Sequence, residues 1–114
     1  MPGTASNAAS VEGTRRYAQR AIDAGASASA YRTLGRTELV TSSLGFGSYR
    51  IDDRTSDHAA ALENALLSGV NLIDTSTNYT DGSSETCIGN VLARHRREEV
   101  IVVSKGGYVQ GQAL

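Results

Sequence analysis

Residues 70–79, VNLIDTSTNY, and residues 100–105, VIVVSK, decide the fold class of this chain. Each stretch begins with a short aliphatic run and continues into polar or ionisable side chains. Such a run is typical of a strand that is covered on both faces, as strands of parallel sheets are. Between the two runs lies a predicted helix whose apolar side chains share one face: Cys87, Ile88, Val91 and Leu92. Strand, helix and strand in this order predict a parallel α/β unit.

The same alternation continues upstream of residue 70. A helix capped by Thr55 or Ser56 is predicted by four apolar positions at helical spacing, namely Ala59, Leu62, Ala65 and Leu66. Gly69 stands where the end of that helix is expected, and Ser83 or Ser84 is the expected cap of the second helix. A first strand is predicted over residues 43–49, ending in a glycine-rich corner, and residues 31–34 and 39–41 predict a β-hairpin. The predicted order is hairpin, β, α, β, α, β.

The first thirty residues have a different composition, dominated by Ala, Ser, Gly and Thr. A segment with so few large apolar side chains buries too little surface to offset its ordering entropy. We therefore expect residues 1–30 to form a flexible extension or a loosely docked helix between Arg15 and Ala24, without a chemical role. The folded domain is expected over residues 31–114.

Composition excludes several classes of protein. The 114 residues carry 11 basic and 12 acidic side chains, a net charge of -1, which argues against binding of nucleic acid. The longest apolar run, Val100 to Val103, is far shorter than the roughly 20 residues of a membrane span. A single cysteine, Cys87, excludes an intrachain disulfide and a thiolate-only zinc site, and favours the cytoplasm. His58 and His95 are expected at the surface, and no metal site is predicted.

Polar groups follow three of the predicted strands, at the end of the sheet where functional groups gather in parallel α/β folds. Asp74 and Lys105 come directly after two apolar runs, and Tyr79 lies on the loop that follows Asp74. A Lys105 ammonium oriented by Asp74 would make the phenol proton of Tyr79 easier to release, which suits a general acid. The alternative interpretation is a structural ion pair with a tyrosine that covers the sheet end.

Gly45 and Gly47 do not form a Rossmann fingerprint, because position 50 is Arg50 and the next helix begins only near Ser56. These glycines either serve a ligand or only permit a tight corner.

Taken together, the motifs resemble the N-terminal part of the aldo-keto reductase family. The resemblance rests on YRTLGRTELVTSSLGFGSYR, NLIDTSTNYTDGSSETCIGNVL and VIVVSKGGY, found in that order between Tyr31 and Gly111. It implies a (β/α)8 TIM barrel preceded by a hairpin that closes its bottom. It also implies binding of NADP(H), more than NAD(H), without a Rossmann domain, and reduction of a small aldehyde or ketone to an alcohol.

The resemblance also assigns residues. The family's catalytic Asp, Tyr and Lys fall on Asp74, Tyr79 and Lys105. Its cofactor contacts near the first strand fall on Gly47, Ser48 and Tyr49, with Asp74 also close to the nicotinamide ribose.

Two departures from the family pattern set further expectations. Thr80 stands where the family commonly has Gly after its Tyr, so a different local turn is expected. Only three of the eight βα units of a barrel are present, and the family's catalytic His, which follows the fourth strand, has no counterpart. We therefore expect an incomplete barrel that is inactive by itself. The alternatives are a non-catalytic nucleotide-sensing barrel, like the reductase-related β-subunits of potassium channels, and a truncated product without function.

Overall fold

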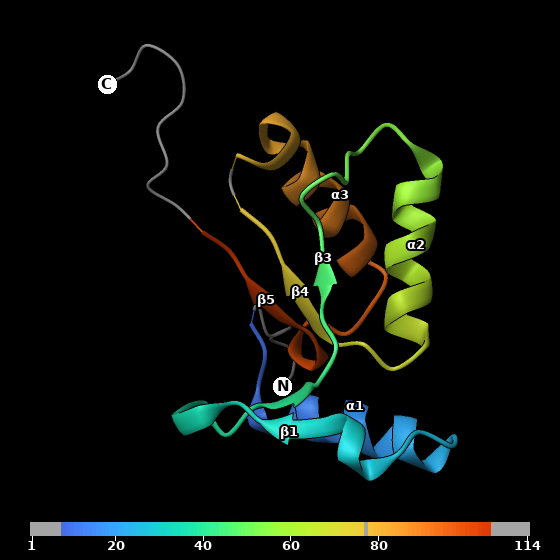
Figure 1. Ribbon diagram of the computed structural model, residues 1–114, viewed down its shortest axis with the longest axis vertical. Helices are drawn as coiled ribbons and strands as arrows, with labels where there is room; N and C mark the ends of the chain where they lie inside the picture. Colours follow the sequence, from blue (N-terminus) through green and yellow to red (C-terminus); the bar gives the residue numbers. More distant parts are fainter. Residues whose placement is uncertain (1–7, 77, 106–114) are drawn as a thin grey trace, which may run out of the picture.

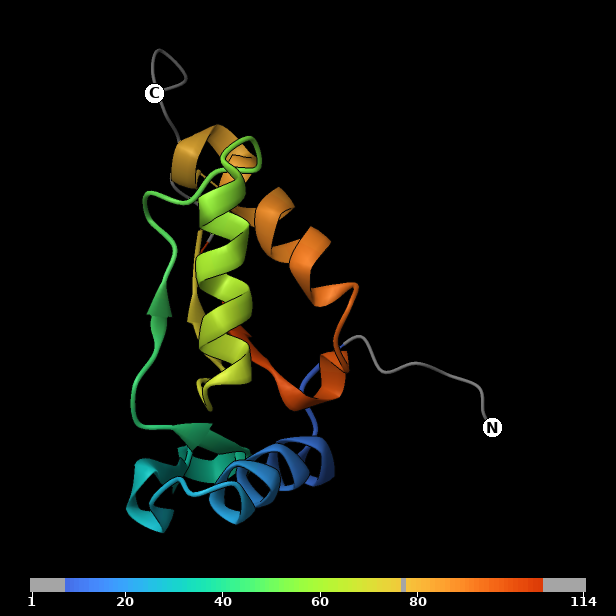
Figure 2. The ribbon, with the colours of Figure 1, turned by 90° about the vertical axis from the view of Figure 1, so that its right-hand side faces the viewer.

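Three parallel strands form the central sheet of the computed structural model, which describes residues 8–76 and 78–105. The strands are β3 (Phe46–Gly47), β4 (Leu72–Asp74) and β5 (Ile101–Val103), and they lie side by side in that order. Helix α2 (Ser56–Leu67) connects β3 to β4, helix α3 (Ser83–Leu92) connects β4 to β5, and both cover the same face of the sheet (Figures 1 and 2). The predicted parallel α/β arrangement is confirmed.

The hydrophobic core lies between this sheet face and the two helices. Register explains its membership, because Phe46 pairs with Ile73 and Ile73 with Val102, so these three side chains point to the same face. They meet buried side chains of both helices, and the buried cluster consists of Leu62, Leu66, Ile73, Ile88, Val91, Leu92 and Val100. Each large aliphatic side chain that is fully buried contributes roughly 1.5–3 kcal/mol. The positions that alternate with the core residues, Leu72 and Ile101, belong to the other face of the sheet.

The helix ends agree with the sequence in one case and differ in another. Gly69, expected at the end of α2, has φ +104, a left-handed conformation that favours glycine. The capping role predicted for Ser83 or Ser84 is wrong, because Gly82 precedes α3 and no side chain caps that helix. Ser83 Oγ instead donates to Asp53 Oδ1 at 2.5 Å. Thr55 precedes α2 as predicted, but its side chain makes no capping hydrogen bond.

The predicted hairpin is present as β1 (Tyr31–Thr33) paired antiparallel with β2 (Val40–Ser42). Asn71, fully buried at the start of β4, joins it to the sheet. Its Oδ1 accepts a hydrogen bond from Ser42 N at 2.8 Å, and its Nδ2 donates to Val40 O at 3.0 Å and to Glu99 O at 3.1 Å. One amide side chain therefore satisfies backbone groups of two elements.

Of the two expectations for the N-terminal segment, the helix is present, but it is longer than expected and is not loosely docked. Residues Val11–Asp23 form a 13-residue helix, α1, which Ser10 caps by accepting a hydrogen bond from Gly13 N at 2.9 Å. Tyr17 is 6% exposed, and its hydroxyl donates to Leu66 O and contacts Val70 O at 3.1 Å. Residues 1–7 lie outside the described residues.

Glu99 provides the strongest link between α1 and the rest of the chain. It lies in the 3₁₀ turn Arg97–Glu99, just before β5, and is 5% exposed. Arg20 donates to both of its carboxylate oxygens, at 2.6 and 3.1 Å, and Arg16 Nε donates at 3.2 Å. Helix α1 and the hairpin therefore lie together below the start of the strands (Figures 1 and 2). Across the described ranges, no helix has the length and apolar character needed to cross a bilayer.

Candidate active site

The carboxyl ends of the three strands lie at one level. Gly47 pairs with Asp74, and Asp74 pairs with Val103. Because parallel strands in register end at the same edge, the residues that follow them share one surface. This edge lies at the opposite end of the sheet from α1 and the hairpin (Figure 1).

Asp74 and Lys105 form an ion pair at this edge. Lys105 Nζ lies 2.5 Å from Asp74 Oδ1, and the two side chains are 49% and 55% exposed. The hydrogen bond to Asp74, followed by one to Tyr79, raises the pKa of Lys105 above its usual value, so the ammonium is charged at neutral pH. An ion pair this exposed contributes little to stability. Its principal effect is to place a fixed positive charge at the sheet edge.

Tyr79 lies next to that charge. It begins the 3₁₀ turn Tyr79–Gly82, and its ring centroid is 5.2 Å from Lys105 Nζ. The Tyr49 ring packs against it edge to face, with centroids 5.1 Å apart and an interplanar angle of 86°. The structure thus brings together the three side chains to which the sequence assigned catalysis.

The Tyr79 turn has an unusual backbone. Thr80 and Asp81 both lie in the left-handed region, with φ of 47° and 57°. This region is costly for a β-branched residue such as threonine, so surrounding contacts must hold it. Thr80 Oγ1 donates to Ile51 O at 2.6 Å, and the Ser83–Asp53 hydrogen bond ties the same two loops together a few residues away. The departure from Gly at position 80 is thus accompanied by a hydroxyl contact that glycine could not make.

A buried network of hydroxyl groups supports the site from below. Ser48 N and Oγ both donate to Asp74 O, at 3.0 and 2.9 Å. Ser84 Oγ donates to Ser48 O at 2.9 Å and lies 3.3 Å from Thr75 Oγ1. The network links the end of β3, the end of β4 and the first turn of α3. The sequence alone does not reveal this network, because a serine near a helix start is explained equally well as a cap.

The residues expected to contact a cofactor divide into two groups. Tyr49 is 65% exposed, and Gly47 has open space beside its Cα, so both can approach a ligand at the edge. Ser48 differs from the expectation, because it is fully buried and its hydroxyl is bound to Asp74 O. Its side chain can orient Asp74 but does not reach the surface.

The two histidines and the cysteine make contacts within the fold and do not lie with the Asp74, Tyr79 and Lys105 group. Both histidines were expected at the surface, but their side chains are half-buried. His58 Nδ1 accepts a hydrogen bond from Asp52 N at 3.0 Å, and His95 Nε2 lies 2.7 Å from Glu63 Oε2. Burial raises the pKa of the Cys87 thiol. Within residues 8–76 and 78–105, no group of three or more His, Cys, Asp or Glu side chains is arranged to hold a metal ion.

The chain is similar in sequence to known proteins. Residues 43–113 match the model of the Aldo/keto reductase family. The chain is 36% identical over 85 residues to Protein tas of Escherichia coli, covering 66% of this chain and 25% of that protein. It is 33% identical over 84 residues to the NADH-specific methylglyoxal reductase of E. coli, covering 67% of this chain and 26% of that protein.

Two solved structures of aldo-keto reductases also align with this chain. The holo form of an aldo-keto reductase from Bacillus halodurans aligns with a TM-score of 0.64 at 30% identity, over 74% of this chain and 28% of that one. A thermostable aldo-keto reductase in complex with the inhibitor epalrestat aligns with a TM-score of 0.60 at 32% identity, over 65% of this chain and 30% of that one. The chain spans about a quarter of the length of the curated relatives that it matches.

Proposed function

This chain belongs to the aldo/keto reductase family, and we propose that it contributes the proton-transfer half of an NAD(P)H-dependent reductase that converts an aldehyde or ketone to an alcohol. The observation that carries the proposal is the arrangement at the carboxyl edge of the sheet. A lysine that is ion-paired with Asp74 at 2.5 Å lies 5.2 Å from the centre of the Tyr79 ring.

In this proposal Tyr79 is the general acid. A carbonyl that accepts hydride becomes an alkoxide, which must be protonated, and the Tyr79 hydroxyl is proposed to donate that proton. The positive charge of Lys105 favours the phenolate that remains after the transfer. Asp74 holds the Lys105 ammonium in place through the hydrogen bond at 2.5 Å, which is also the largest cause of the raised pKa of that lysine.

The described residues suit a nicotinamide dinucleotide. Gly47 leaves room for close approach, Tyr49 offers an exposed aromatic face, and the Asp74 carboxylate, 55% exposed, can accept a hydrogen bond from a ribose hydroxyl. When bound, the reduced nicotinamide would supply the hydride. Ser48 would act indirectly, by fixing the backbone of Asp74.

A titration of the complete polypeptide with NADPH and with NADH would show which dinucleotide it binds more tightly. The family resemblance implies NADP(H) more than NAD(H), yet a relative at 33% identity is named an NADH-specific methylglyoxal reductase. The proposal therefore covers both cofactors. The substrate class is a small carbonyl compound, and the activity is proposed to need strands beyond the three described, because eight close a barrel of this type. We keep the cytoplasm as the expected location, consistent with the buried free thiol of Cys87.

The test is Tyr79→Phe in the complete polypeptide that carries this sequence. The change removes the transferable proton and leaves the ring, so carbonyl reduction should fall by about 10² to 10⁴-fold while dinucleotide affinity is retained. Tyr49→Phe is the matched control, because it alters the neighbouring ring in the same way and should keep most of the activity. Near-normal turnover by Tyr79→Phe would refute the role assigned to Tyr79.

A further inference from the structure

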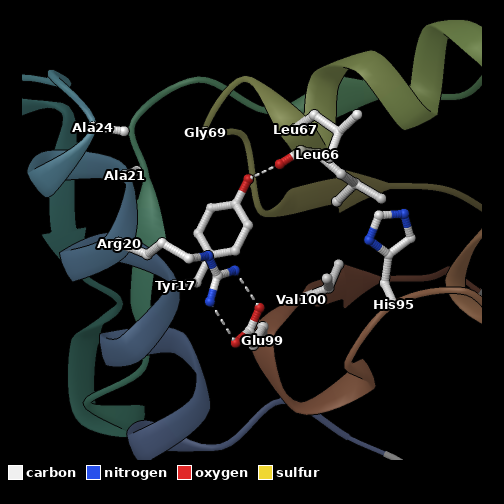
Figure 3. Close-up of a pocket in the computed structure, with 10 residues that line it drawn as sticks. All are labelled: Tyr17, Arg20, Ala21, Ala24, Leu66, Leu67, Gly69, His95, Glu99 and Val100. Atoms are coloured by element: carbon white, nitrogen blue, oxygen red, sulfur yellow. Dashed lines mark hydrogen bonds and ion pairs between the residues drawn. The ribbon is translucent and has the colours of Figure 1, made fainter.

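A recess lies at the other end of the sheet from Asp74, between α1, the end of α2 and the connection from α3 to β5 (Figure 3). Its volume is about 160 Å³, and its lining includes Tyr17, Leu66 and Val100. Two small residues also line it, Ala21 on α1 and Ala24, the residue that follows α1. Arg20, His95 and Glu99 belong to the lining as well, so one wall of the recess is apolar and the other is charged. A space of roughly 150 Å³ can hold a benzene ring.

A basic hollow adjoins this recess. Arg20, His95 and Glu99 line both spaces, and the hollow has a volume of about 680 Å³. Arg16, Arg94 and Arg96 complete its set of charged side chains, so four guanidinium groups face one buried carboxylate.

Nearby carboxylates neutralise only part of this positive charge. Glu99 pairs with Arg16 and Arg20, and Glu63 pairs with Arg94 at 3.3 Å. Arg96 is exposed, and in the described ranges no carboxylate lies within ion-pair distance of it. Two carboxylates against four guanidinium groups leave a surplus of positive charge at the mouth of the recess.

We propose that this recess binds a small anion with an apolar body, of the aromatic or short aliphatic carboxylate class. The apolar body occupies the space between Ala21, Ala24 and Leu66, and the carboxylate lies among the arginines with Arg96 as its principal partner. The recess and the proposed active site lie at opposite ends of β4. The recess borders Gly69, which precedes the strand, whereas Asp74 is the last residue of the strand. We therefore expect anion binding in the recess to be independent of the proposed reductase activity.

The probes separate the two parts of the site. The complete polypeptide that carries this sequence is titrated with benzoate, with benzyl alcohol, which keeps the ring without the charge, and with acetate, which keeps the charge without the ring. Benzoate should bind saturably and at least tenfold more tightly than either. Equal affinity for benzyl alcohol or for acetate, or no saturable binding of benzoate, would overturn the proposal.

Variants locate the binding. Arg96→Gln should weaken benzoate binding about tenfold, as expected for loss of one charge-assisted hydrogen bond. Arg36→Gln, a change at an exposed arginine in the hairpin turn, is the matched control and should have no effect. Ala21→Leu fills the recess and should abolish benzoate binding. If Ala21→Leu does not fold, Ala24→Leu is used in its place, because Ala24 is exposed and lines the same recess.

Benzoate could also bind beside Lys105, so Lys105→Met is included. Binding that survives Lys105→Met and is weakened about tenfold by Arg96→Gln supports the recess. Binding that is lost in Lys105→Met and unchanged in Arg96→Gln would overturn the proposal and place the anion at the sheet edge.

Discussion

Replacing Glu99 with glutamine tests how α1 is held to the domain. The wild-type carboxylate accepts three hydrogen bonds from two guanidinium groups, at 2.6, 3.1 and 3.2 Å, and its side chain is 6% exposed. In Glu99→Gln one acceptor oxygen is replaced by an NH₂ group, which would face the Arg donors. The helix should therefore lose most of this anchor without a change in side-chain volume.

The expected cost of Glu99→Gln follows from the burial of the partners. Breaking a buried ion pair costs roughly 3–5 kcal/mol, whereas exposed pairs contribute roughly 0–1 kcal/mol. Here the carboxylate is buried but the Arg16 and Arg20 side chains are 45% and 58% exposed, so both can be hydrated after the change. A loss of about 2 kcal/mol is expected, which lowers the Tm of a domain of this size by about 10 °C.

The pH dependence gives a second readout. Burial alone would raise the pKa of Glu99, but the hydrogen bonds from Arg20 and Arg16 outweigh it and lower the pKa. A carboxyl whose folded pKa is lowered stabilises the protein above its unfolded pKa, and this contribution is lost as the pH falls through the folded value. The difference in stability between wild type and Glu99→Gln should therefore be full at pH 7 and shrink below about pH 4.

Thermal unfolding of both proteins at pH 7 and at pH 3 provides the assay. Glu12→Gln is the matched control, because it removes an exposed ion pair with Arg15 on the same helix, and it should change the stability by less than about 0.5 kcal/mol. If Glu99→Gln were no more destabilising than Glu12→Gln, α1 would not be anchored by Glu99, and a loosely docked extension would be the correct description.

Three further predictions concern single residues. Gly13→Ala should lower the stability by about 1–3 kcal/mol in thermal unfolding, because its Cβ would lie 2.4 Å from Glu98 O, a backbone atom; an unchanged Tm would contradict the close packing of α1. Ser84→Ala should cost about 1–3 kcal/mol because it leaves buried partners unsatisfied, and Ser84→Thr, which keeps the hydroxyl, should recover part of it; equal losses in both would show that volume, not the hydroxyl, matters. Lys105 should titrate above its usual pKa in an NMR experiment, and Asp74→Asn should lower that value; no change would mean that the ion pair does not persist in solution.

Much of the fold could be predicted from local pattern. The apolar run at residues 100–103 predicts a strand, and the strand β5 occupies Ile101–Val103. Gly69 follows the end of α2 with a left-handed conformation that suits glycine. The convergence of Asp74 and Lys105 required only that both follow parallel strands in register. Topology then brought together residues that lie 31 positions apart in sequence.

The parts that escaped prediction depend on distant partners. The apolar stripe of α1 is thin, and the helix is anchored by Glu99, 79 residues beyond Arg20. The role of Ser84 depends on a contact with Ser48, 36 positions earlier. Neither contact leaves a periodic signal in the sequence, since a buried carboxylate and a buried serine resemble surface residues until their partners are known.

The central claim is that Asp74 and Lys105 act on Tyr79 as one unit. A double-mutant cycle measures this most directly: kcat/KM for carbonyl reduction is determined for Asp74→Asn, Lys105→Met and the double variant, in the complete polypeptide. Groups that act together give strongly non-additive losses, so the double variant should lose about as much activity as Lys105→Met alone. Losses that add in free energy would contradict the account, because they would show that Asp74 and Lys105 contribute independently.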